Sequence, residues 1–261
     1  MNTVDLKTEI RSYLSNELSH IEGEMGEMVR VVALRKGGLL RPQIAIRSAE
    51  IYGVPRNHVM PAAAGIELVH GATLILDDSP LMDNSDTRNG EKSFHLTYGT
   101  DKAILDAQHL TASVAPELNS NNPYLNSEMK NRIQAESARA AEGLCLGQLD
   151  DLHHKPESLE DVVELHRKKT GDVFAAATVI GGIAGNAPEN EIDLLRSFGH
   201  NLGIAYQVGD DIYDVLGNEK KGGKPTGQDV DKITVFDFMA VHEAVDFWRG
   251  FYSKAEENLA K

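Results

Sequence analysis

The sequence contains little cysteine and no long apolar run, and each shortage excludes a class of protein. Among 261 residues the one cysteine is Cys145, so no internal disulfide can form, which is typical of a reducing compartment. The first seven residues lack the basic and then apolar pattern of a secretory signal. The longest weakly polar run, residues 174–187, is too short and too rich in glycine to span a bilayer. We therefore expect a cytoplasmic protein without stable membrane insertion.

Positive charge and strand patterns are also scarce. The chain has 26 lysines and arginines against 40 aspartates and glutamates, a net charge of −14, which argues against nucleic acids and anionic membranes as partners. The alternating pattern of β-strands is almost absent, as are repeats, linkers of proline and serine, and a Walker phosphate-binding loop. These observations predict one all-helical domain covering residues 1–261.

Negative charge is concentrated at two places, and the second of these has helical spacing. Asp210 and Asp214 are four residues apart, so a helix places both on one face, with Asp211 beside them and Gln207 one turn earlier. No lysine or arginine lies between them to relieve their repulsion. A set of carboxylate oxygens favours a hard cation, Mg²⁺ or alternatively Mn²⁺. The other interpretation is a solvated acidic face of a helix.

The first acidic cluster follows an apolar helical run that starts near Ala62. Asp77 and Asp78 end that run, Pro80 interrupts the helix, and Asp83 follows the interruption. His70, Thr73 and Asp77 share one helix face by their spacing. Two such clusters can hold Mg²⁺ ions that bind substrate phosphates. The cations that suit this interpretation are Arg88, Lys169 and Lys224.

Periodic apolar residues predict further helices. We expect an amphipathic helix over residues 6–21, a long helix over 126–152, and a last helix over 239–259. Ser158 and Asp161 predict a helix start, and that helix should end near Lys169. Residues 22–28 are interpreted as solvated surface. Residues 116–123, with three asparagines and two prolines, are interpreted as a loop.

Both clusters resemble the two aspartate-rich motifs of the trans-isoprenyl diphosphate synthases, or polyprenyl synthetases, of the geranylgeranyl and farnesyl diphosphate synthase type. Further motifs follow in the family's order from about Leu34 to Thr234: Leu40-Arg-Pro42, Glu67-Leu-Val-His70, Gly147-Gln148, Lys169-Thr170 and Gly223-Lys-Pro-Thr-Gly-Gln-Asp229. The resemblance implies an isoprenoid synthase-type helical bundle around a central active-site cavity, a homodimer, and a prenyltransferase that joins an allylic and a homoallylic diphosphate.

The resemblance also assigns roles to residues. It implies Mg²⁺ ligands at Asp77, Asp83, Asp210 and Asp214. It adds Asp78, Asp211 and Lys169 to the catalytic set. The homoallylic diphosphate, isopentenyl diphosphate, is expected at Arg41 and His70. The allylic diphosphate is expected at Arg88, Lys169, Thr170, Gln207 and Lys224.

Two departures from the family pattern fall on the homoallylic side. Gly38 stands where the family has a lysine, and Asn89 stands where it has the second of two arginines. A hydrogen bond to a charged group contributes about 1.5–3 kcal/mol, so two losses predict weak binding of isopentenyl diphosphate. Lys36 and Lys92 are the candidate substitutes.

The residues before the first cluster bear on product length. In the family, bulky side chains four and five positions before the first aspartate stop chain growth. Thr73 and Ala72 occupy those positions here and are small. The resemblance therefore implies geranylgeranyl diphosphate or a longer product.

Three hypotheses remain from the sequence. The first is a chain-elongating prenyltransferase. The second is a relative that ionises an allylic diphosphate without isopentenyl diphosphate, by cyclisation, hydrolysis or an unusual coupling. The third is a non-catalytic partner subunit, which the complete set of carboxylates disfavours.

Overall fold

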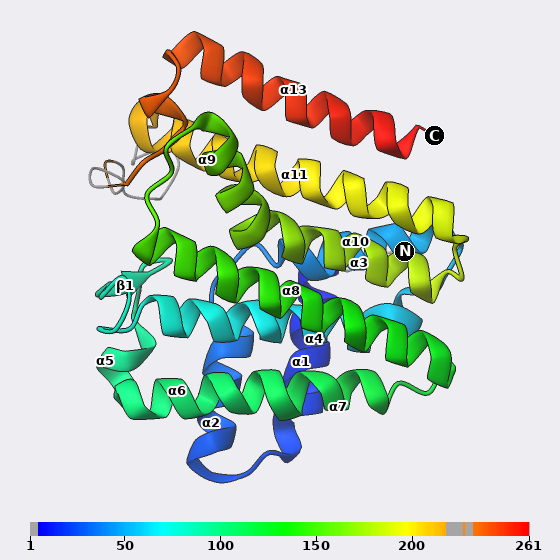
Figure 1. Ribbon diagram of the computed structural model, residues 1–261. Coiled ribbons are helices and arrows are strands. Elements are labelled where there is room, and N and C mark those ends of the chain that lie inside the picture. Colours follow the sequence, from blue (N-terminus) through cyan, green and yellow to red (C-terminus); the bar gives the residue numbers. More distant parts are fainter. Residues whose placement is uncertain (1–4, 218–226, 228–231, 261) are drawn as a thin grey trace. The chain divides into compact units, whose positions relative to one another are not determined.

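The fold is almost entirely helical, as the sequence predicted (Figure 1). The computed structural model describes residues 5–217, 227 and 232–260. The chain divides into two compact units: the first comprises the residues up to Ser137 with Val179–Ala187, and the second Ala138–Thr178 with the residues from Pro188 on. Helices α8 (Ser127–His153) and α10 (Asp172–Ala184) each run from one unit into the other. The expected single domain stays a prediction.

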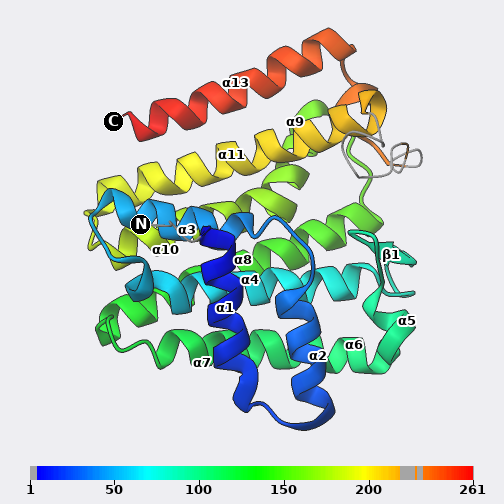
Figure 2. The ribbon, with the colours of Figure 1, turned by 180° about the vertical axis from the view of Figure 1, so that it is seen from behind.

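The first unit contains the amino-terminal helices and one short hairpin. Figure 2 shows α1 and α2 side by side. Its elements are α1 (Leu6–Glu17), the 3₁₀ turn η1 (Leu18–His20), α2 (Gly23–Leu34), α3 (Leu40–Ile51), α4 (Arg56–Asp77), β1 (Thr87–Arg88), β2 (Glu91–Lys92), α5 (Phe94–Tyr98), α6 (Thr100–His109), the π-helical turn η2 (Leu110–Val114) and α7 (Ala115–Ser120).

Helix α4 forms the core of the first unit. It is long and apolar enough to cross a membrane by length and composition, but 72% of its most apolar stretch is buried, which identifies it as a core helix. It packs against α3, α6 and α7. A Cβ atom on Gly65 would lie 3.2 Å from the carbonyl oxygen of Ala115, so the missing side chain allows the close approach of α7. This packing fixes the position of α4 in the first unit, and with it the position of Asp77 at the end of the helix.

Two predicted boundaries and one predicted environment in this unit were wrong. Helix α4 begins at Arg56 rather than near Ala62, because Pro61 lies within the helix. Residues 116–120 are helical, because Pro116 occupies the first turn of α7, where no backbone N–H is needed. Met28 is buried in α2 instead of lying on a solvated surface.

The second unit is built on α11 and α13, which lie side by side (Figure 1). Its core contains buried apolar side chains of α9, α11, η4 and α13, among them Val162, Val208, Val235 and Phe251. The predicted cap is present, with Ser158 and Asp161 forming a capping box. The remaining elements are α9 (Leu159–His166), the π-helical turn η3 (Arg167–Gly171), α11 (Glu189–Leu216), the 3₁₀ turn η4 (Val235–Asp237) and α13 (Val241–Leu259).

One buried acid in α6 should make the stability of the protein depend on pH. Asp106 is 0% exposed, and neither carboxyl oxygen has a hydrogen-bond partner among the residues that the structure describes. Burial raises the pKa of Asp106 to about 7. In the unfolded chain the pKa is about 3.9. The folded state therefore holds its proton longer, and the free energy of unfolding should fall as pH rises from about 4 to about 7.

Asp106→Asn removes this titration. We expect the variant to be about 2–4 kcal/mol more stable than the wild type at pH 8 and nearly equal to it at pH 4. Urea unfolding of both proteins at a series of pH values measures the difference. Parallel pH profiles for the two proteins would show that Asp106 does not titrate in this range.

Candidate active site

The first carboxylate cluster is formed where α4 ends and the chain folds back. The backbone N–H of Asp83 donates to the carbonyl oxygen of Asp77 at 2.8 Å, and that of Ser85 donates to Asp78 at 3.1 Å. The helix ends at Asp77, as Pro80 predicted. The fold-back brings Asp83, which is exposed, beside Asp77, which is half-buried. The backbones of the two residues are thus adjacent although Pro80 lies between them in the sequence.

Asp78 has a different environment from Asp77 and Asp83. It is 1% exposed, and its carboxylate accepts from Nε of Arg88 at 2.7 and 3.0 Å, and also from Nη2. Burial alone would lower the pKa of Arg88, but Asp78 outweighs burial and holds it above its ordinary value. The pair fixes the β1–β2 hairpin, whose turn has Asn89 and Gly90 at φ of 54° and 76°. Asp78 therefore positions Arg88.

Two polar residues of α4, Glu67 and His70, lie two to three turns before Asp77 and interact with arginines of neighbouring segments. Burial and then Arg41 lower the pKa of His70 to about 4, so the imidazole is neutral near pH 7. Burial would raise the pKa of Glu67, but His70, Arg41 and Arg35 outweigh it and lower the pKa. The structure thus places the two predicted homoallylic residues, Arg41 and His70, together with Glu67 and Arg35.

The second carboxylate cluster lies at the carboxyl end of α11. Asp210 and Asp214 are half-buried and one turn apart in the continuous helix, as predicted. The N–H of Gly227 donates to the carbonyl oxygen of Asp214 at 3.2 Å. Asp211 is buried, with Oδ2 at 3.1 Å from Nε2 of His166 and at 3.4 Å from the N–H of Val235. Asp211 therefore anchors α9 and η4 to α11.

The sequence predicted that a helix ends near Lys169. The structure instead places Lys169 and Thr170 in a π-helical turn. Turn η3 continues α9 into α10 without a break. The hydroxyl of Thr170 donates to Oε1 of Gln207 at 2.9 Å. Nζ of Lys169 forms an ion pair with Asp151, and Nζ of Lys232 lies 3.8 Å from the same carboxylate. Turns of this type are frequent at functional sites.

The pair of Lys169 and Asp151 is electrostatically stabilised. Burial alone would raise the pKa of Asp151, but Lys169 and Lys232 outweigh it and hold the pKa below its ordinary value. The carboxylate therefore stays ionised and directs both ammonium groups. The sequence alone did not identify Lys169 and Lys232 as the partners of Asp151.

Two glycines allow α8 and α11 to pack closely against the turn η3. A Cβ atom on Gly147 of α8 would lie 2.6 Å from the backbone nitrogen of Lys169. A Cβ atom on Gly203 of α11 would lie 2.6 Å from Cα of Gly171. Real Cβ atoms do not approach backbone atoms so closely, so both helices reach η3 only because these positions carry no side chain. The turn that carries Lys169 and Thr170 is thereby fixed on both sides.

The carboxylates suit a hard divalent cation. Asp77 with Asp83, and Asp210 with Asp214, offer only oxygen ligands, which Mg²⁺ prefers. Within the described ranges, no group of three or more histidine, cysteine, aspartate or glutamate side chains is arranged as a complete metal site. Mg²⁺ commonly keeps waters and takes phosphate oxygens as further ligands, so two carboxylates at each place are adequate. Lys224 lies outside the described residues.

Comparison with known proteins identifies the family. The model of the polyprenyl synthetase family matches residues 22–249. A chloroplastic geranylgeranyl pyrophosphate synthase of Catharanthus roseus is 31% identical over 242 residues, 90% of this chain and 68% of that protein. A farnesyl diphosphate synthase of Bacillus subtilis is 32% identical over 220 residues, 81% of this chain and 74% of that protein.

A solved structure supports the same conclusion. The geranyltransferase of Helicobacter pylori, crystallised with magnesium and isoprenyl diphosphate, is 26% identical with a TM-score of 0.85, covering 97% of this chain and 88% of that one. The fold is thus that of the all-helical isoprenoid synthases. The chain belongs to the polyprenyl synthetase family. It is a prenyltransferase of isoprenoid biosynthesis, as the sequence predicted.

Proposed function

We propose that the chain condenses an allylic diphosphate with isopentenyl diphosphate to a trans-polyprenyl diphosphate of geranylgeranyl length or longer. The observation that carries this proposal is the fixed arrangement of Lys169, Thr170 and Gln207 on η3 and α11, just before the second carboxylate cluster. Asp151 positions the ammonium of Lys169, Gln207 positions the hydroxyl of Thr170, and the close contacts at two glycines fix the turn that carries both. A fixed ammonium and hydroxyl are suited to an anionic substrate.

The proposed chemistry begins with departure of the allylic diphosphate. Bound Mg²⁺ supplies Lewis acidity toward the leaving oxygens. Asp77, Asp83, Asp210 and Asp214 would hold the metal, and Mn²⁺ has the same ligand preference. Lys169 adds positive charge where negative charge develops. The C–O bond breaks with its electron pair on the diphosphate.

The resulting allylic cation is attacked by the double bond of isopentenyl diphosphate. A carbon–carbon bond forms, and the released diphosphate takes the proton that restores a double bond. Apolar walls around the cation would keep water from quenching it. Without bound diphosphate His70 is neutral near pH 7, so the positive charge beside it comes from Arg41.

The second candidate function is ionisation without isopentenyl diphosphate. Gly38 and Asn89 favour it, because neither supplies a charged donor. The presence of Asp77, Asp83, Asp210 and Asp214 again disfavours a non-catalytic subunit.

Product analysis distinguishes these functions. The protein is incubated with Mg²⁺ and geranyl or farnesyl diphosphate, with and without isopentenyl diphosphate, and the products are identified by mass spectrometry. We expect products only when isopentenyl diphosphate is present, with geranylgeranyl diphosphate or longer chains dominant. Conversion of the allylic diphosphate alone would support the second candidate and contradict the proposal.

Product length should be set by the turn before Asp77. Thr73 is half-buried on the same face as His70 and Asp77, whereas Ala72 is 1% exposed and packed in the core. Thr73→Phe is therefore expected to shorten the main product by at least one isoprene unit, and Ala72→Phe to act in the same direction with a loss of stability. Thr73→Val is the control, since it removes the hydrogen bond to His70 without adding bulk. An unchanged product distribution in Thr73→Phe would contradict the assignment.

We also propose a homodimer in the cytoplasm. In the first unit α6 exposes Ile104 and Leu105 by 43% and 54%, and in the second unit α8 exposes Leu146, Leu149 and Leu152 by 41–48%. On α8 these leucines recur every three residues and form one apolar stripe, which a second copy could bury. Light scattering should give twice the chain mass of 28.5 kDa. The single cysteine is compatible with a reducing compartment.

A further inference from the structure

A cavity of about 600 Å³ lies at the amino-terminal end of α4, whereas the first carboxylate cluster lies at the other end of that helix. Its walls come from α1, η1, the first two turns of α4 and the segment from Val114 to Tyr124, all within the first unit. Figure 2 shows α1 running across the direction of α4 and α7. A cavity of this volume is typical of sites for small molecules. No described residue assigned to catalysis lines it.

Much of the cavity lining is apolar. The ring of Tyr124 stacks on His58 with the ring centroids 4.1 Å apart, yet Tyr124 is still 50% exposed and lines the cavity. An apolar ligand body would be shielded from water here. Four further apolar residues of the lining are at most 8% exposed: Leu18, Met60, Val114 and Leu118.

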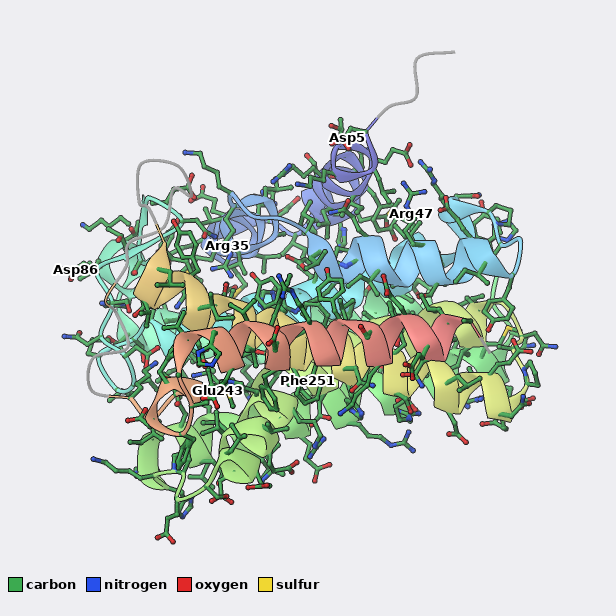
Figure 3. All side chains as sticks on the ribbon, turned by 90° about the horizontal axis from the view of Figure 1, so that it is seen from above. Asp5, Arg35, Arg47, Asp86, Glu243 and Phe251 are labelled. Carbon is green, nitrogen blue, oxygen red and sulfur yellow. The ribbon has the colours of Figure 1, made fainter. Side chains whose placement is uncertain are left out.

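Arg56, an arginine of the lining, is already held by two carboxylates. Its Nη1 donates to Glu9 at 3.0 Å, and its Nε donates to Glu50 at 2.6 Å. Glu50 also accepts from Nη1 of Arg47 on α3 at 2.6 Å (Figure 3). The start of a helix favours negative charge, and Glu9 and Glu50 supply it at the start of α4. Little positive charge is therefore left for an anionic ligand.

Two other glutamates of the lining, Glu17 and Glu117, are exposed and have no cationic partner among the described residues. The carboxylate of Glu117 accepts one long hydrogen bond, from the side-chain amide of Asn121 at 3.5 Å. Glu17 is the last residue of α1, whose last turn contains no basic residue. The carboxyl end of a helix favours positive charge. The lining thus presents negative charge that lacks a counter-charge.

Tyr13 adds a hydrogen-bonding group to the same wall. It is half-buried and lines the cavity, and its hydroxyl has no hydrogen-bond partner within the part of the chain that the structure describes. Burial raises the pKa of Tyr13, and the negative charge of Glu17 raises it further. The phenol therefore stays protonated, and its oxygen can accept a hydrogen bond from an ammonium group.

We propose that this cavity binds an organic cation, a small molecule with an apolar body and a protonated amine. The amine faces Glu17 and Glu117, with the rings of Tyr13 and Tyr124 in the same lining. The apolar body faces the buried side chains of α4, η2 and α7. Carboxylates and aromatic rings both attract an ammonium group. The inference is independent of the proposed function, because α1, η1 and α7 carry none of the residues assigned to catalysis.

Calorimetric titration with three probes of nearly one shape tests the charge preference. Phenylbutylamine, phenylbutanol and phenylbutanoate carry a positive charge, no charge and a negative charge on the same apolar body. We expect the amine to bind about tenfold more tightly than the alcohol, and the carboxylate to bind more weakly than either. The proposal is overturned if the carboxylate binds as tightly as the amine, or if binding of the amine is undetectable at concentrations of about 1 mM.

Variants that remove one charge locate the bound amine. Glu17→Gln and Glu117→Gln keep the shape of the side chain, and each should weaken amine binding about three- to tenfold while alcohol binding stays within about twofold of the wild type. The matched control is Glu27→Gln, which changes an exposed glutamate of α2 outside the lining and should bind the amine as the wild type does. Wild-type affinity for the amine in both cavity variants would show that the amine binds elsewhere.

Tyr13→Phe separates ligand binding from a structural role. It removes a hydroxyl without a partner and keeps the ring, so the melting temperature should not fall, whereas amine binding should weaken about threefold. The prenyltransferase activity of all these variants should equal that of the wild type in the absence of a probe. Equal losses of amine and alcohol binding, with lowered melting temperatures, would show a disturbed fold instead of a lost contact and would contradict the proposal.

Discussion

Asp77→Ala and Asp210→Ala should each lower kcat at least about a hundredfold without unfolding the protein. Each residue is one of two metal-binding carboxylates at its place, and among the described residues no further group of ligands could compensate. The loss should appear in kcat as well as in KM, because the metal acts on charge that develops during departure of the diphosphate.

Each variant has a matched control, an aspartate that lies in the same unit but is not one of the proposed metal ligands. Asp86→Ala changes an exposed residue two positions before Arg88, and Asp246→Ala one with a 73% exposed side chain on α13. Both should retain wild-type kcat. Equal losses in control and cluster variants, or full wild-type activity in excess chelator, would contradict the metal assignment.

Replacement of Gly147 or Gly203 by alanine should displace the turn η3. The added methyl groups would overlap backbone atoms of Lys169 and Gly171, and neither backbone can rotate away as a flexible side chain would. Overpacking of this kind costs about 1–3 kcal/mol of stability. Displacement of Lys169 and Thr170 by even about 1 Å should lower kcat/KM for the allylic diphosphate about tenfold or more.

The control for this prediction is Gly250→Ala. Gly250 lies in α13, and a Cβ atom there would meet nothing within 4 Å. Alanine is the better helix former, so this variant should keep full activity and gain up to about 1 kcal/mol. Thermal unfolding and kinetics of the three variants measure both effects. Wild-type activity in Gly147→Ala and Gly203→Ala would show that the position of η3 is not critical.

The sequence was sufficient for the fold class because helical periodicity and the lack of strand patterns are local signals. The ends of elements were less predictable. The prolines of residues 116–123 suggested a loop, but Pro116 lies in the first turn of α7, where a missing N–H has little cost. Turn η3 could not be predicted, because the glycines that hold it come from α8 and α11, far from it in the sequence.

The sequence predicted which residues belong to the candidate site but not which groups their side chains contact. The resemblance added Asp211 to the catalytic set beside Asp210 and Asp214, whereas the structure buries Asp211 against His166. The role of Asp211 in catalysis therefore stays a prediction.

A double-mutant cycle on Asp77 and Asp210 tests most directly the proposal that both clusters take part in the same step, departure of the allylic diphosphate. The measured quantity is kcat/KM for the allylic diphosphate in the wild type, Asp77→Ala, Asp210→Ala and the double variant. Residues that act as one unit give non-additive losses. We predict that the double variant loses little more activity than the more damaged single variant. A loss equal to the product of the two single losses would show that the clusters act independently and would contradict the account.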